Sequence, residues 1–317
     1  MSGQVKTIAR ILQAAGSAIQ ANGNLVLLNV ENGHLVERIF DGEELKDQRL
    51  VVDGVKSGAS AAFVVSDNHV SHKLSPYALI LYITDGGELR ASEFDPDSEE
   101  WDESELNGLG EINVQEESGL SAVTINDSIL VFYQAPDGTI KSIRHDQGTK
   151  TWKAGFSVPG AAEIGTPIAA FNNKEALIVA FVEKDGTIHA HSRDFASGDW
   201  SETILPNSSF DDKIANLSVS QDITSGELDS YVLIGSTLHH VKKNGEQAVI
   251  GTFSNKEFVA ATRAEDGDWY GNNYGNVNMG GRGGYGGSYG GGGYGGGYGG
   301  YGGYSPYPPP YRTQCGW

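Results

Sequence analysis

The chain has 317 residues, of which 41 are acidic and 22 are basic, so its formal net charge is −19 at pH 7. This acidity argues against binding to nucleic acid or to an anionic membrane, since both require a basic face. No window approaches the roughly 18 apolar residues of a membrane span, and the single cysteine, Cys315, excludes an intramolecular disulfide.

The N-terminal segment carries a weak helical pattern over residues 4–15, which is equally compatible with a strand. It lacks the continuous apolar stretch of a signal peptide. We therefore expect a cytoplasmic protein, or one that is released without a signal peptide.

A strand–turn–strand block follows and recurs about every 50 residues. Its clearest copies are ILVFYQAPDGTI at 129–140 and LIVAFVEKDGTI at 177–188. The markers of the turns are Gly33, Gly87, Gly138 and Gly186, with Ser236 in a fifth, eroded copy. An apolar residue stands two positions after each marker: Leu35, Leu89, Ile140, Ile188 and Leu238. Because alternate residues of a strand share a face, we expect these side chains to point into a shared interior.

Each copy is flanked by further strands. A short apolar segment precedes it, at 17–20, 61–65, 121–125, 167–171 and 217–220, and a sixth such segment stands at 258–262. A later strand bearing Trp101, Trp152 or Trp200 closes several copies. Four short antiparallel strands, repeated around an axis, define a β-propeller, so we predict an all-β propeller over residues 1–270. The sixth segment favours six blades, with residues 5–12 completing the last as a strand, over five.

Residues 271–317 differ sharply in composition, because they hold 20 of the 44 glycines and 9 of the 14 tyrosines and no Asp, Glu or Lys. Such a segment cannot bury a core, so we predict a disordered tail. Its spaced tyrosines indicate self-association or weak adhesion, and a passive linker is the alternative. The segment Pro308–Tyr311 formally fits a Pro-Pro-x-Tyr ligand for a WW-type partner.

The third copy carries a family resemblance. The string FYQAPDGTI at 132–140, followed by Trp152 and Gly155, resembles a repeat of the fungal fucose-specific lectins. The likeness covers roughly residues 15–262 and is strongest over 119–203. It implies a six-bladed propeller with sugar bound between adjacent blades. At each site it implies an Arg that donates hydrogen bonds, a Glu that accepts them and an aromatic wall.

This sequence departs from the family at the Arg and Glu positions. The Arg position holds Leu25, Leu79, Leu130 and Ile178, and the Glu position holds Glu37, Ala91, Ser142, Ala190 and His240. The candidate carbohydrate-binding residues are therefore Glu37, Trp101, Tyr133, Gln134, Trp152 and Trp200. Purely structural roles remain open: an exposed carboxylate beside Arg38 for Glu37, packing between outer strands for the tryptophans, and strand propensity and turn packing for Tyr133 and Gln134.

Two histidines, His189 and His191, alternate along one strand and could in principle share a metal ion. No acidic residue or cysteine stands at ligand spacing in the sequence, so we expect neither a metal nor a cofactor. The Gly-x-Gly-x-x-Gly matches lie in the tail, where they follow no strand and open no helix. The sequence has no nucleophile elbow, triad order or informative pair of carboxylates, so it predicts no enzyme.

These observations predict a lectin-like propeller whose partners are glycans, fucosylated ones according to the resemblance. A self-associating tail would cluster several propellers and raise avidity. The alternative is a propeller that binds no sugar and serves as a scaffold for protein–protein interaction.

Overall fold

The computed structural model describes residues 3–20, 22–66, 77–104, 106, 108–173, 175–222, 225–254 and 257–261. Within them the chain forms one helix and 21 strands. No helical segment in these ranges is long and apolar enough to span a membrane. The predictions for the tail at 271–317, including its self-association and the ligand at Pro308–Tyr311, lie outside the described residues.

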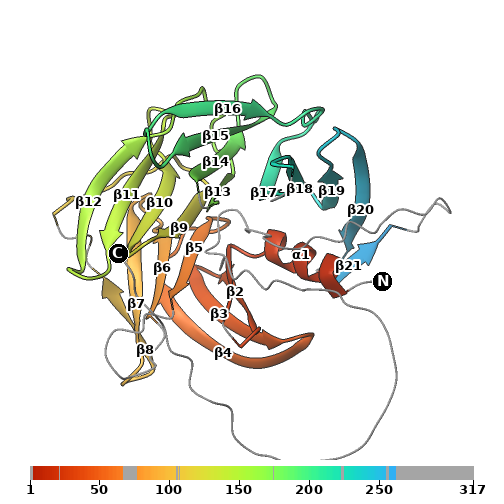
Figure 1. Cartoon of the computed structure of the whole chain (residues 1–317). Helices are drawn as coiled ribbons and strands as arrows, with labels where there is room; N and C mark the ends of the chain where they lie inside the picture. The colour runs from red at the N-terminus through yellow and green to blue at the C-terminus, as the bar shows by residue number, and fades with distance from the viewer. Residues whose placement is uncertain are drawn as a thin grey trace, which may run out of the picture. The chain divides into compact units, whose positions relative to one another are not determined.

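The strands form five sheets in chain order, which we call blades 1 to 5 (Figure 1). Blade 1 contains β1 (Gly16–Ile19), β2 (Leu25–Glu31), β3 (His34–Asp41) and β4 (Glu44–Asp53). Blade 2 contains β5 (Ala61–Ser66), β6 (Tyr77–Ile83), β7 (Leu89–Asp95) and β8 (Glu100–Ser104). Blade 3 contains β9 (Leu120–Ile125), β10 (Ser128–Gln134), β11 (Ile140–Asp146) and β12 (Thr151–Ser157). Blade 4 contains β13 (Ile168–Asn172), β14 (Ala176–Val182), β15 (Ile188–Asp194) and β16 (Trp200–Ile204). Blade 5 contains β17 (Ile214–Gln221), β18 (Leu228–Ile234), β19 (Thr237–Val241), β20 (Gln247–Ser254) and β21 (Glu257–Ala260).

The predicted hairpins join the second and third strands of every blade. Gly138 and Gly186 turn there with φ of 85° and 79°, a backbone conformation that glycine adopts without strain. The apolar residues that follow the turns, Leu35, Leu89, Ile140, Ile188 and Leu238, are all fully buried. The repeat was therefore read correctly from the sequence.

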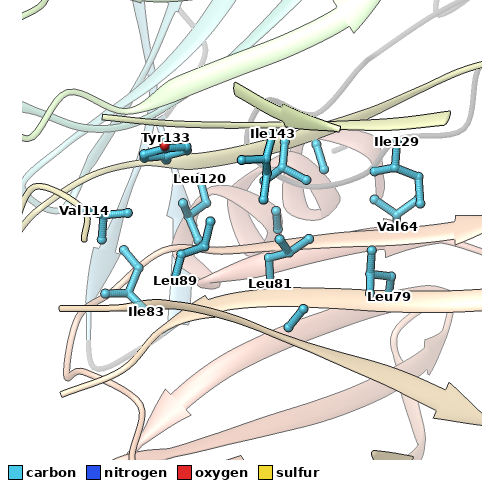
Figure 2. Packing of buried hydrophobic residues seen from close by; sticks show 14 of the residues in the cluster. Val64, Leu79, Leu81, Ile83, Leu89, Val114, Leu120, Ile129, Tyr133 and Ile143 are labelled. Atoms are coloured by element: carbon cyan, nitrogen blue, oxygen red, sulfur yellow. The ribbon is translucent and has the colours of Figure 1, made fainter. Parts of the chain in front are cut away.

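The core lies in the seams between neighbouring blades. Four apolar clusters each combine side chains of two consecutive blades. Figure 2 shows the seam of blades 2 and 3, where Leu81 and Leu89 pack near Leu120 and Ile143. Blades 2, 3 and 4 each have such a seam on both sides, so their central strands are buried on both faces. All seven residues of β10 in blade 3 are buried, for example.

The helix α1 (Gly3–Gln13) lies between the last blade and the first (Figure 1). Ile8 and Leu12 pack on blade 5 against Leu233 and Leu238, whereas Ile11 packs on blade 1 in a cluster with Leu25 and Leu27. The prediction of a strand over residues 5–12 was wrong. Apolar side chains on two sides of a helix fill this gap between two sheets.

The sixth apolar segment forms no new blade. Residues 257–260 pair with β20 as β21 and extend the outer edge of blade 5. The described part of the chain therefore has five blades, the alternative in the sequence analysis, instead of the six that the sequence favoured.

Candidate functional site

The seam of blades 1 and 2 brings a buried carboxylate and a guanidinium together. Glu37 on β3 stands directly opposite Arg49 on β4 in the strand register, and the side chain of Glu37 is only 6% exposed. Its Oε2 atom lies 3.3 Å from Nε of Arg49. Arg49 also binds Asp47 at the surface, with 2.6 Å between Nη2 and Oδ2. The pair is thus anchored inside the seam and reaches solvent through Arg49.

Aromatic side chains of blade 2 form the opposite wall of this site. Trp101 on β8 packs on Phe94 of β7, with ring centroids 5.3 Å apart. The guanidinium of Arg49 lies over the Phe94 ring, 5.4 Å from its centroid. Such a cation–π contact holds the guanidinium over the face of the ring and leaves its N–H groups available for hydrogen bonds.

Burial sets the electrostatics of Glu37. Removal from water raises the pKa of its carboxyl group, and the charge of Arg49 and the nearby indole N–H of Trp101 oppose that rise. Oε2 of Glu37 and Nε1 of Trp101 are both buried, and neither has a well-formed hydrogen bond within the described residues. The ion pair with Arg49 and the nearby indole N–H of Trp101 stabilise the carboxylate, and both buried atoms keep the capacity for a further hydrogen bond.

Arg49 is the residue that sequence reasoning missed. It comes from β4, outside the family motif, whereas the motif position on β2 is the buried Leu25. The cross-strand pairing of Glu37 with Arg49 is the signal that could have found it. Arg38, the neighbour proposed for Glu37, instead makes a two-pronged bond to Glu31 with distances of 2.7 and 2.9 Å.

The other candidates lie in different seams. Tyr133 and Trp152 are buried in the seam of blades 2 and 3, where Trp152 packs against His145 in a tilted arrangement with ring centroids 4.5 Å apart. Trp200 lies at the seam of blades 3 and 4 and packs edge-on against Phe156. Of the six candidates, Glu37 and Trp101 share the seam of blades 1 and 2, and Tyr133 and Trp152 share the seam of blades 2 and 3.

Gln134 is the last residue of β10 and is fully buried. Its amide nitrogen donates to the carbonyl oxygens of Gly138 and Glu163, at 3.0 and 2.9 Å. Its amide oxygen accepts from the backbone N–H of Gly165 at 2.7 Å. The side chain is therefore committed to tying blade 3 to the chain that enters blade 4.

A cavity of about 480 Å³ lies beside the C-terminal end of α1. Its lining includes Leu12, Asn29, Arg38, Ser118, Pro167 and Asn216. Asn216 donates from Nδ2 to the carbonyl oxygen of Leu12 at 2.9 Å, which holds the end of the helix at the wall of the cavity.

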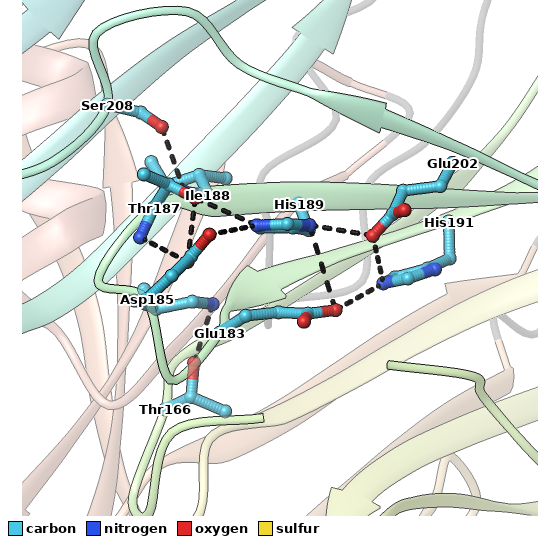
Figure 3. Close-up of polar contacts among 10 residues, drawn as sticks. Thr166, Glu183, Asp185, Thr187, Ile188, His189, His191, Glu202 and Ser208 are labelled. Carbon is cyan, nitrogen blue, oxygen red and sulfur yellow. Dashed lines mark hydrogen bonds and ion pairs between the residues drawn. The ribbon is translucent and has the colours of Figure 1, made fainter. Parts of the chain in front are cut away.

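On blade 4 the structure places two acidic residues beside His189 and His191, although no acidic residue stands at ligand spacing in the sequence. Glu183 and Glu202 lie beside His189 and His191, and one ligand atom from each of the four falls within 4.8 Å of the others (Figure 3). Glu202 stands opposite His191 in the register of β15 and β16. The acidic partners come from another strand and a turn, so the spacing along one strand did not reveal them.

The architecture and the seams place the chain among β-propellers, and comparisons with known proteins agree. No family model matches the sequence. The search among curated proteins also finds no match. Among solved structures, AofleA from Arthrobotrys oligospora matches with a TM-score of 0.57 at 18% identity, over 75% of this chain and 71% of that chain.

Two structures of Aleuria aurantia lectin are also similar. A variant in complex with Fucα1-6GlcNAc has a TM-score of 0.60 at 16% identity, over 74% of this chain and 78% of that one. A second structure, described as a six-bladed β-propeller with a novel fucose recognition mode, has a TM-score of 0.53 at 17% identity, over 75% of this chain and 77% of that chain. The resemblance to fungal fucose-specific lectins is thus confirmed at the level of the fold.

Proposed function

We propose that the protein binds glycans, as a lectin and without catalysis, and that the seam of blades 1 and 2 is its main binding site. The observation that carries this proposal is the convergence of Glu37, Arg49 and Trp101. A neutral polyol needs a hydrogen-bond acceptor, a donor and a flat apolar surface for its C–H groups, and these residues supply one of each.

Fucosylated glycans are the first class to test. The similar solved structures include complexes with a fucosylated disaccharide and with α-methyl-L-fucoside. In the proposed complex Arg49, whose side chain is 31% exposed, turns toward the sugar and lets a hydroxyl group reach Glu37. The Trp101 indole N–H, which is buried without a well-formed hydrogen bond, then donates to the same ligand.

The test is a glycan panel followed by titration calorimetry on the full chain. We expect binding to α-methyl-L-fucoside or to a fucosylated oligosaccharide. The substitutions Glu37→Gln and Trp101→Phe should each weaken it at least about tenfold, which is ~1.4 kcal/mol. Glu103→Gln is the matched control, because Glu103 lies on β8 with Trp101 but faces solvent and pairs with Arg90.

Two results would refute the proposal. One is that the full chain binds no glycan of the panel. The other is glycan binding that both seam variants leave unchanged, which would move the site away from this seam. Circular dichroism spectra of the variants show whether each keeps the fold.

A further inference from the structure

Four ligand atoms converge on one point on the face of blade 4 that is turned toward blade 3 (Figure 3). Nδ1 of His189 lies 2.7 Å from Oε1 of Glu202 and 3.8 Å from Oε1 of Glu183. Nε2 of His191 lies 2.9 Å from the same Glu183 oxygen and 3.9 Å from the same Glu202 oxygen. A tetrahedral site with bonds of ~2.1 Å has edges of about 3.4 Å, and the four distances lie on both sides of this value.

Hydrogen bonding around His189 leaves the correct ring nitrogen for a metal. The Thr187 hydroxyl donates to Oδ1 of Asp185 at 2.8 Å, so its oxygen can only accept from Nε2 of His189, also at 2.8 Å. Oδ2 of Asp185 is a second acceptor for Nε2, at 3.1 Å. Nε2 therefore keeps its hydrogen, and Nδ1, which donates to Oε1 of Glu202 at 2.7 Å, is the nitrogen that would give up its proton to a metal ion. This carboxylate–histidine arrangement is the usual outer shell of a metal-bound imidazole.

Three of the four ligands are buried and closely covered, and Glu202 is half-exposed. The side chains of His189 and His191 are 7% and 4% exposed, and the ring of Phe181 stacks on His191 at 5.0 Å. The backbone at Gly160 covers the other side. A Cβ atom there would stand 2.2 Å from Oε1 of Glu183 and 2.7 Å from Nε2 of His191, so the close approach requires glycine.

We propose that Glu183, His189, His191 and Glu202 bind one divalent transition-metal ion, with zinc as the best match. Two imidazoles and two carboxylates suit zinc, which favours nitrogen ligands and four-coordination, better than calcium or magnesium, which favour oxygen alone. The ion connects the turn after β14 with β15 and β16. It is a site separate from the seam of blades 1 and 2.

The experiment uses the full chain without an affinity tag, stripped of metal by a chelator and then dialysed. Titration calorimetry with Zn²⁺ should show one ion per chain, and thermal unfolding should shift upward when Zn²⁺ is present, because binding to the folded state stabilises it. Co²⁺ in place of Zn²⁺ should give the visible absorption bands of a four-coordinate ion.

Variants separate this site from adventitious binding. Glu202→Gln removes a half-exposed ligand, which the fold should tolerate, and should weaken Zn²⁺ binding about 100-fold. Asp185→Asn changes no metal ligand, but it alters the acceptors that hold Nε2 of His189 and the Thr187 hydroxyl, and it should weaken Zn²⁺ binding about tenfold. Two controls should bind Zn²⁺ like the unaltered chain: His239→Gln, which removes a histidine from the matching strand of blade 5, and Cys315→Ser.

The proposal is overturned if the stripped chain shows no saturable binding of one ion. It is equally overturned if Glu202→Gln and Asp185→Asn bind Zn²⁺ as tightly as the unaltered chain, since the ion would then sit elsewhere. A loss of binding in the His239→Gln or Cys315→Ser controls would also assign the ion to another place.

Discussion

At the scale of single residues, Gln134 shows how a polar side chain can specify the contact between blades. Its three side-chain hydrogen bonds all go to backbone groups. Its own backbone N–H donates to Oγ of Ser118 at 2.8 Å. A buried amide with every group paired fixes the positions of its partners, whereas an apolar side chain of the same size would leave those partners unpaired.

We therefore predict that Gln134→Leu lowers the free energy of unfolding by about 3 kcal/mol, because each buried group left unpaired costs about 1–3 kcal/mol. Urea denaturation measures this change, with the m-value kept constant. Gln48→Leu, at an exposed glutamine on β4, should change stability by no more than about 0.5 kcal/mol. A loss below ~1 kcal/mol in Gln134→Leu would mean that the amide is dispensable.

Glu37 leads to a prediction about pH. Burial raises the pKa of its carboxyl group in the folded state, so the folded chain holds this proton more tightly than the unfolded chain. The contribution of Glu37 to stability is therefore greatest below the usual pKa of an unfolded glutamate and declines as pH rises through the raised value. Glu37→Gln removes this dependence.

Unfolding in urea at about pH 4, 5.5 and 7 tests this sign. Glu37→Gln should gain stability relative to the unaltered chain as the pH rises, since glutamine never carries the buried charge. Glu103→Gln, at a surface position, should show a constant difference. A relative loss in Glu37→Gln with rising pH would mean that the ion pair with Arg49 outweighs the burial of the carboxylate.

At the scale of elements, α1 supplies the packing between blade 5 and blade 1. Its side chains pack on blade 5 and blade 1 at once. Apolar residues three or four positions apart, such as Ile8 and Leu12, form one apolar face of a helix. Ile11 precedes Leu12 by one position, so its side chain points in another direction and contributes to a second apolar face. Helix packing thus covers two sheet faces that would otherwise be exposed to water.

Truncation of one side chain tests that role. Leu12→Ala should lower the free energy of unfolding by about 2–5 kcal/mol, the range for a buried leucine that leaves a cavity. Gln13→Ala, the exposed next residue of the same helix, serves as the control and should cost less than about 0.5 kcal/mol. Equal stabilities of the two variants, from chemical denaturation, would mean that α1 is not part of the cooperative core.

Element by element, the sequence predicted what recurs. The turns around Gly138 and Gly186 and the buried residues after them follow from local rules of turns and alternation, so they could be read directly. Residues 5–12 could not, because a pattern compatible with helix and strand is decided by the space between blades 1 and 5. The pairings of Glu37 with Arg49 and of His191 with Glu202 depend on the register between neighbouring strands, which the pattern of residues within a single strand does not reveal.

At the scale of the whole described body, the ring has a distinctive closure. The inner strands contact one another in chain order, from β1 through β5, β9 and β13 to β17. The helix α1 contacts both blade 5 and blade 1 and so joins the two ends of this series. A closed ring protects every sheet face, so stability depends on the contact that closes the ring as much as on any blade. Here the N-terminal helix makes that contact, and it can be deleted without removing a strand from any blade.

Removal of residues 2–13 is therefore the sharpest test of the architecture. The truncated chain exposes Leu25 and Leu27 of blade 1 and Leu233 and Leu238 of blade 5, so it should bind a hydrophobic dye and melt at a lower temperature. A synthetic peptide of residues 1–15 should restore the melting temperature in a concentration-dependent manner, because it binds only the folded ring. The same peptide with Leu12→Ala should restore it less. A truncated chain that melts like the full chain and ignores the peptide would show that five blades close without the helix.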